Sequence, residues 1–133
     1  MPDPGEVAVP AGWKPGGTAE MLVIARTYDL LLWSLPQITK IPRIHRFTLG
    51  GRMENLVFDI LENLLEAKYA KEKLRPLERV NIRLEKLRFL VRVCKDFKYL
   101  NIRRYEYLSG RINEVGRLTG GWLRHHLRMH LRP

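Results

Sequence analysis

The sequence predicts an all-α protein, a single antiparallel bundle of four helices that run up and down in chain order. Four segments carry apolar residues at the three- and four-residue spacing of one helix face. No stretch shows the strict alternation of a half-buried strand. A chain of 133 residues is also long enough to bury one core without disulfides or metal.

Prolines and capping residues set the expected bounds of the first two helices. Thr18 is a suitable N-cap for the first, and Pro36 should end that helix or closely follow its end. A linker over residues 37–47 then leads to a second helix, expected over residues 49–73. The outer face of this second helix is acidic.

The last two helices have similar signals. Pro76 should start the third, because its missing N–H costs nothing at the first helical position, and this helix should reach about residue 97. Asn101 is a good cap for the fourth helix. The pair Gly120-Gly121 should loosen the end of the fourth helix, so that a basic tail closes the chain.

These signals predict one folded domain with two tails. Residues 1–17 hold four prolines and four glycines and are expected to be a disordered tail. The four-helix bundle should span residues 18–124. A His- and Arg-rich basic tail should cover residues 125–133.

Positive charge is concentrated in the second half of the chain. Residues 1–70 hold seven basic and eight acidic side chains, a net charge of −1, whereas residues 71–133 hold seventeen and six, a net charge of +11. Such a concentration repels itself and is relieved by a polyanion, most commonly nucleic acid. We therefore expect RNA, or DNA, as the partner. The alternative is a solvated basic surface that only keeps the protein soluble.

Basic residues form two rows on the third helix. At 100° per residue, four of them fall within about 80° of one face and three lie nearer the other edge of the apolar seam. The spacing of about 5–6 Å along each row is close to that of successive phosphates on one strand. The rows are Arg75, Arg79, Arg83 and Lys86, and Arg88, Arg92 and Lys95.

The third helix is apolar on two faces, and a helix of this kind needs two partners. One face is the bundle seam. The other, Ile82, Phe89 and Val93, predicts an interface with a second copy of the chain. The alternative is that the first or second helix wraps far enough round to cover it.

Patterns for enzyme chemistry are nearly absent. No Glu has a His three residues later, which excludes a di-iron bundle, and no Gly-rich phosphate loop follows a strand. Cys94 lies on the apolar seam, where an inert core thiol is expected. His126 and His130 share a helical spacing, but no cysteine or carboxylate accompanies them. We therefore expect no catalytic residue, no cofactor and no metal.

One segment of the C-terminal tail favours a different function. Arg124, the polar His125 and His130 resemble the Arg-polar-x4-His motif of the HEPN ribonucleases, which are also helical bundles. In that reading, the Arg and His would stabilise and protonate the cleaved phosphodiester. The expected position after two glycines argues against it, because such chemistry needs a rigid element.

The sequence also predicts the compartment. The first residues are acidic rather than basic and no apolar core follows them, so no signal peptide is expected. No apolar run reaches the roughly 18 residues of a membrane span. A lone cysteine fits a reducing compartment. A cytoplasmic protein without a membrane partner is the expectation.

Three segments of the chain form recognisable motifs. They are Ile-Pro-Arg-Ile-His at residues 41–45, Leu-Arg-Phe-Leu-Val-Arg at residues 87–92, and Glu-Val-Gly-Arg-Leu-Thr-Gly-Gly-Trp at residues 114–122. Together they resemble the accessory variability determinant (Avd) proteins of diversity-generating retroelements. The last motif is the most specific, and the resemblance covers roughly residues 20–124. The same superfamily includes proteins encoded within ribosomal RNA genes.

This resemblance implies a four-helix bundle that assembles into a basic homopentameric barrel. It also implies a non-enzymatic accessory protein that associates with a retroelement reverse transcriptase and its template RNA and supports mutagenic retrohoming. A ribosomal-RNA-associated structural protein of the same fold is the alternative. The implied family-motif positions are Arg43, His45, Arg88, Arg92 and Arg117, and Arg46 in the same linker is added as a candidate for nucleic-acid binding.

Overall fold

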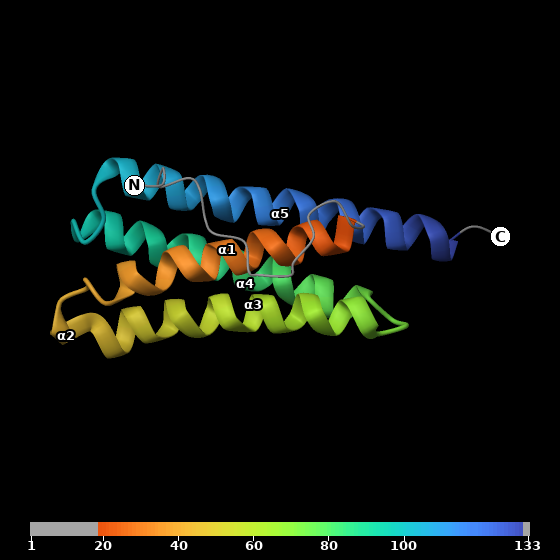
Figure 1. Ribbon diagram of the computed structural model, residues 1–133, viewed down its shortest axis with the longest axis horizontal. Coiled ribbons are helices and arrows are strands. Elements are labelled where there is room, and N and C mark those ends of the chain that lie inside the picture. The colour runs from red at the N-terminus through yellow and green to blue at the C-terminus, as the bar shows by residue number, and fades with distance from the viewer. Residues whose placement is uncertain (1–18, 132–133) are drawn as a thin grey trace.

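Four long helices lie side by side and antiparallel in the computed structural model, which describes residues 19–131 (Figure 1). Neighbouring helices pack in a closed order, α1 on α3, α3 on α4, α4 on α5 and α5 on α1. No strand occurs in the described part of the chain. The prediction of an all-α four-helix bundle is therefore confirmed. The elements are α1 (Ala19–Ile38), α2 (Arg43–His45), η1 (Arg46–Gly50), α3 (Gly51–Tyr69), α4 (Leu74–Asp96) and α5 (Ile102–Leu131).

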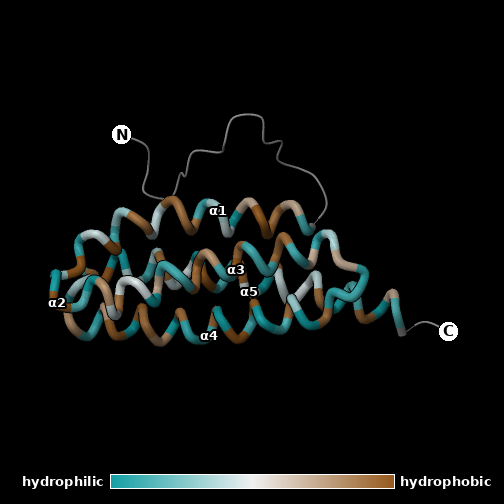
Figure 2. The backbone as a smooth tube through the Cα atoms, turned by 90° about the horizontal axis from the view of Figure 1, so that it is seen from below, coloured by the Kyte–Doolittle hydropathy of each residue, from teal (hydrophilic) through white to brown (hydrophobic). Residues whose placement is uncertain are grey.

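The core follows the predicted apolar seams. Hydrophobic residues recur along all four long helices, and α1 is the least polar of them (Figure 2). On α4 the whole predicted seam is buried, which removes a continuous apolar stripe from water. Its members are Leu77, Val80, Leu84, Leu87, Val91 and Cys94.

Pro36 does not end the first helix, contrary to the prediction. Helix α1 continues for two residues beyond it, to Ile38. A proline removes one backbone hydrogen bond, but Ile38 and the following Ile41 are buried in the core and hold the last turn in place. The Thr39 hydroxyl also donates to the Pro36 carbonyl at 2.7 Å.

The expected linker 37–47 is largely helical. The short α2 leads directly into η1, one turn of π-helix, and then into α3. Gly50 is buried where this turn meets the end of α1, and a Cβ there would lie 3.0 Å from the Ile38 side chain. Glycine therefore permits a close approach that a larger residue would push apart.

Helix α3 ends at Tyr69, earlier than the predicted residue 73, and α4 starts at Leu74, before Pro76. The Glu72 carboxylate fixes this start, because it accepts from the Leu74 N–H at 2.8 Å. Pro76 is then the third helical residue. Its missing N–H is still among the first four that have no partner within the helix, so the earlier start carries no penalty.

Helix α5 passes through Gly120-Gly121 and through the predicted boundary at residue 124, so the His- and Arg-rich segment is helical to Leu131. Two glycines in a helix cost about 1 kcal/mol each relative to alanine. The next residue, Trp122, is only 3% exposed in the core, and its burial offsets that cost. The predicted tail 1–17 and the Thr18 cap lie outside the described residues.

Lys73 closes the carboxyl end of α3. Its ammonium donates to the carbonyls of Ala67, Lys68 and Ala70 at 2.6, 3.2 and 2.8 Å. These carbonyls would otherwise lack partners, and a cation there also opposes the partial negative charge of the helix end.

Replacing this cap should destabilise the bundle. We expect Lys73→Met to lower the free energy of unfolding by about 1–2 kcal/mol, because it removes charge-assisted bonds to three carbonyls. Urea unfolding measures the change. Lys71→Met, at an exposed lysine of the same connection, is the matched control and should have little effect. Equal losses in both variants would contradict the role of the Lys73 cap.

Candidate nucleic-acid interface

The first basic row of α4 faces the acidic side of α3. Arg79 pairs with Glu66 at 3.6 Å. Arg83 lies 3.8 Å from Asp59 and donates to the Asn63 side chain at 2.8 Å. The acids that pair with these arginines come from the first half of the chain. A count of the charges in the second half alone does not show that these partners exist. This pairing leaves Arg79 and Arg83 partly neutralised.

The second basic row lies toward α5. Arg88 donates to the Asn113 side chain at 3.1 Å and to the Glu85 carboxylate at 3.0 Å. A Cβ on Gly116 would lie 2.8 Å from the Arg88 guanidinium, so the glycine makes the space in which this side chain crosses to α5. Arg88 therefore braces α4 against α5.

The next two residues of this row are also engaged. Lys95 lies over the Tyr105 ring at 4.9 Å, a cation–π contact between α4 and α5. Arg92 is more exposed and reaches Asp96 one turn further along α4, at 4.0 Å. Arg92 is thus the member of the row that remains most available to a ligand.

Three further candidates keep free cations. The charged groups of Arg75, Lys86 and Arg117 are exposed and have no hydrogen bond or ion pair to any described residue. Arg75 and Lys86 lie on α4, whereas Arg117 lies on α5. The predicted nucleic-acid-binding residues are therefore spread over several faces rather than one track.

The remaining candidates lie at one end of the bundle. We call residues 39–50 and 97–105 the basic bundle end: the first segment joins α1 to α3, and the second joins α4 to α5 (Figure 1). The His45 ring lies 5.7 Å from the Phe97 ring and so connects the two segments. Arg43 is exposed without a partner among the described residues, whereas the Arg46 guanidinium donates to the Ile41 carbonyl at 3.1 Å.

Sequence reasoning missed several side chains at this end. Lys98, Arg103 and Arg104 were not among the candidates, although they stand in a segment without acids. That local lack of acidic residues was a signal that could have found them. An analysis of single helices could not show that their segment meets the segment of Arg43 and His45, because that contact joins two different connections of the bundle.

The second apolar face of α4 is left uncovered by the described residues 19–131. Ile82 is 56% exposed, Phe89 is 61% exposed and Val93 is 36% exposed. Neither α1 nor α3 wraps round to bury them, so the intrachain alternative does not hold. An open hollow of about 470 Å³ lies beside Phe89, between α3 and α4.

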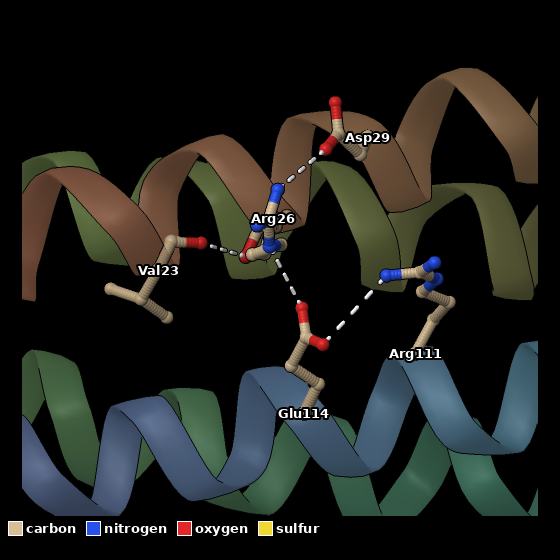
Figure 3. Close-up of polar contacts among 6 residues, drawn as sticks. Val23, Arg26, Asp29, Arg111 and Glu114 are labelled. Atoms are coloured by element: carbon tan, nitrogen blue, oxygen red, sulfur yellow. Dashed lines mark hydrogen bonds and ion pairs between the residues drawn. The ribbon is translucent and has the colours of Figure 1, made fainter. Parts of the chain in front are cut away.

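A cluster of four charges joins α1 to α5 (Figure 3). Arg26 pairs with Asp29 at 3.4 Å and with Glu114 at 3.0 Å, and Arg111 lies 3.7 Å from the second Glu114 oxygen. Asp29 is 8% exposed, and burial raises the pKa of its carboxyl group even though Arg26 opposes the shift. This cluster holds the two helices together.

The C-terminal part of α5 carries the histidines. The rings of His126 and His130 are in contact, with centroids 4.2 Å apart and planes tilted by 55°. Burial, followed by the positive charge of His130, lowers the pKa of His126. Arg124 and His130 are six residues apart, which places them about 120° apart around the helix. No group of three metal-ligating side chains occurs among the described residues.

Cys94 has the environment of a structural thiol. It is buried, its sulfur lies 3.4 Å from that of Met53, and burial raises its pKa to about 11. A thiol with so high a pKa stays protonated at neutral pH and is a poor nucleophile. This agrees with the interpretation of Cys94 as an inert core residue.

Comparison with known proteins identifies the family. The family model described as bAvd-like matches residues 21–126. The chain belongs to the bAvd-like family. The match includes all three segments that resemble Avd proteins and extends to His126 on α5.

A solved structure supports the fold of this bAvd-like chain. A crystal structure of a protein of unknown function from the S23 ribosomal protein family of Bacteroides thetaiotaomicron has a TM-score of 0.74 and 12% identity, and the match covers 80% of this chain and 99% of that one. At this identity the likeness concerns the fold alone. None of the curated proteins matches significantly in sequence.

No described helix is long and apolar enough to cross a membrane.

The pKa of Asp29 gives a test of the α1–α5 cluster. Because the folded-state pKa is raised, Asp29 contributes most to stability below its unfolded pKa, and this contribution is lost as pH rises through the folded pKa. We expect wild type to gain stability relative to Asp29→Asn as the pH falls from neutral toward about 4. Urea unfolding of both proteins across this pH range measures the difference in their free energies of unfolding. The other titrating groups are the same in both proteins, so their contributions largely cancel. A difference that is constant with pH, or that moves the other way, would contradict the raised pKa.

Proposed function

We propose that this chain is a non-enzymatic, cytoplasmic accessory protein of a retroelement reverse transcriptase. In this proposal it binds the template RNA, and DNA through the same charges, and so supports mutagenic retrohoming. The observation that carries the proposal is the bAvd-like match over residues 21–126 in a chain with a net charge of +10. Nucleic acid is the partner that such a charge favours.

Free cations support the RNA-binding part. Arg43, Arg75, Lys86 and Arg117 hold exposed charges without partners among the described residues. A cation already held by a carboxylate releases fewer counterions from RNA than a free one. The free set, rather than the paired Arg79 and Arg83, should therefore dominate the affinity.

The exposed face of α4 supports an oligomer. The apolar stripe Ile82, Phe89 and Val93 lies between two rows of opposite charge. Such a surface is complementary to a rotated copy of itself at its free charges, because Arg75 and Lys86 of one chain can meet Glu78 of the next. The other charges of the two rows already have ion-pair partners within the chain. We propose that the chains form a closed ring. The resemblance to Avd proteins suggests five subunits, a homopentamer. The rows are Arg75, Arg79 and Lys86 on one side, and Glu78, Glu85 and Asp96 on the other.

Salt dependence tests the RNA-binding part. We expect a labelled single-stranded RNA to bind with an affinity that falls linearly on logarithmic axes as salt rises. Each phosphate contact contributes about −0.7 to the slope, so Arg117→Gln and Arg43→Gln should each reduce it by about that amount. Fluorescence anisotropy measures the affinity.

The matched control is Arg83→Gln, which removes a cation that Asp59 and Asn63 already hold. Its slope should stay close to that of wild type. No RNA binding by wild type near physiological salt would remove the proposal. Cleavage of the RNA that disappears in His130→Ala would instead favour the HEPN-like ribonuclease.

The oligomer has its own test. We expect Phe89→Glu to convert the assembly to monomer, because it places a charge in the centre of the apolar stripe. Light scattering measures the mass. Tyr69→Glu changes an aromatic side chain that is 79% exposed but lies outside the stripe, and it should leave the mass unchanged. A monomeric wild type at micromolar concentration would contradict the proposed interface.

A further inference from the structure

The basic bundle end combines concentrated charge with exposed rings. Its two segments hold six Lys and Arg and no Asp or Glu. Several large apolar side chains at the same end are left in water, most of all Phe47, which is 81% exposed. An exposed apolar patch of this kind marks an interaction site. The others are Ile44, Phe97 and Ile102.

Three rings at this end contact one another. Phe97 and Tyr99 lie nearly parallel, at 20°, with centroids 5.6 Å apart. His45 contacts both, at 5.7 and 6.1 Å. These contacts join the connection between α1 and α3 to the turn between α4 and α5. The cluster thus occupies a fixed position at the end of the bundle, while Phe97 remains 58% exposed.

Most of the cations around these rings are free. Arg46 donates to the Ile41 carbonyl, but the charged groups of the other five have no partner among the described residues. Unpaired like charges repel one another, so the arrangement is stabilised when an anion binds. The five are Lys40, Arg43, Lys98, Arg103 and Arg104.

Lys98 adds an observation from the backbone. Helix α4 ends with the Tyr99 N–H donating to the Cys94 carbonyl at 2.8 Å and the Lys98 N–H donating to the Lys95 carbonyl at 2.9 Å. This helix ending requires a left-handed residue, usually glycine, and Lys98 occupies it with φ of 64°. A lysine is strained there, and strain of this kind is common at functional sites. Lys98 is exposed and lies between the two stacked residues, Phe97 and Tyr99, in the sequence.

We propose that the basic bundle end is a stacking platform for single-stranded nucleic acid. Unpaired bases stack on Phe47 and Phe97, and the surrounding cations bind the phosphates. This inference rests on the proposed function and deepens it, because it assigns the stacking of bases to one end of the molecule. Free cations elsewhere, such as Arg117, contact phosphates further along the strand. Rings that present a face beside a basic groove are the usual basis of binding to single strands without sequence preference.

Other classes of partner fit this end less well. The centre of a protein interface is depleted of charge, whereas here six like charges lie in the same two segments as the rings. A membrane-surface helix needs a long apolar face, whereas α2 and η1 together span only residues 43–50. A duplex keeps its bases stacked inside, where Phe47 and Phe97 cannot reach them.

The test uses a single-stranded oligonucleotide of about eight nucleotides that contains 2-aminopurine, whose fluorescence falls on stacking. We expect the full chain to quench it and to bind its duplex form more weakly. Phe47→Ala and Phe97→Ala should each lose the quenching and weaken binding by about 5- to 100-fold, with the salt slope unchanged. Arg104→Gln should keep the quenching and reduce the slope by about 0.7.

Two further variants separate contact from folding. Tyr69→Ala removes an equally exposed ring at the other end of α3 and should bind like wild type. Lys98→Gly should raise the melting temperature, because glycine relieves the left-handed strain, and yet weaken binding. A variant that is more stable and binds less cannot be explained by misfolding. A Lys98→Gly protein that binds like wild type would contradict the role given to Lys98.

Several outcomes overturn the platform. Wild-type affinity and quenching in both phenylalanine variants would do so while leaving RNA binding, and thus the proposed function, intact. Equal affinity for duplex and single strand would mean that charge alone binds.

Loss of reverse transcriptase co-purification in Phe47→Ala, with oligonucleotide affinity unchanged, would assign the end to a protein partner. Binding to anionic vesicles that needs Phe47, without oligonucleotide binding, would assign it to lipid. Only a wild type that binds no nucleic acid removes the proposed function as well.

Discussion

Pairing between acids of α3 and bases of α4 determines which charges of this bundle remain free. Helix α4 carries seven basic and three acidic residues, and α3 carries two basic and four acidic ones. Because the two helices are neighbours, Arg79 and Arg83 meet Glu66 and Asp59 and are partly neutralised. The bundle therefore does not present α4 as one continuous basic track. Free cations are left on α5, on the outer edge of α4 and at the basic bundle end.

The basic edge of α4 that faces α5 is also mainly structural. Arg88 crosses above Gly116 to reach Asn113, and Lys95 lies over Tyr105. Each contact uses a cation to attach one helix to another, as the four-charge cluster around Glu114 does between α1 and α5. Exposed ion pairs contribute little to stability one by one. Their larger effect here is to fix side-chain positions and to limit which cations can bind a ligand.

Periodicity predicted the fold because the seam of each helix is a local property. Every predicted core position of α4, from Leu77 to Cys94, is buried. Helix ends were predicted less well, because they depend on contacts far away in sequence. Pro36 stays inside α1 because Ile38 is held by the core, and α5 passes Gly120-Gly121 because Trp122 is buried. The single sequence shows the proline and the glycines but not the burial that offsets their cost.

The candidate site divides in the same way. A helical projection correctly placed Ile82, Phe89 and Val93 on an outer face, since one helix determines it. It could not show that Asp59 would reach Arg83, or that His45 would lie against Phe97, because each of these contacts joins two segments. The segments without acids at residues 39–50 and 97–105 were visible in the sequence. Only folding shows that they form one surface.

The two proposed surfaces are compatible because they lie on different parts of the bundle. The stripe Ile82, Phe89 and Val93 lies on the exposed side of α4. The basic bundle end lies at one end of the bundle's long axis, where α1 connects to α3 and α4 connects to α5 (Figure 1). In a ring built through the stripe, rotational symmetry places every basic bundle end on the same rim. One single strand could then contact several ends at once, and a second contact within a bound strand is favoured by high effective concentration. Phe89→Glu breaks the ring, so it should weaken the binding of a long strand, which spans several basic bundle ends, much more than the binding of a short strand. Phe89 itself lies outside the proposed nucleic-acid contact.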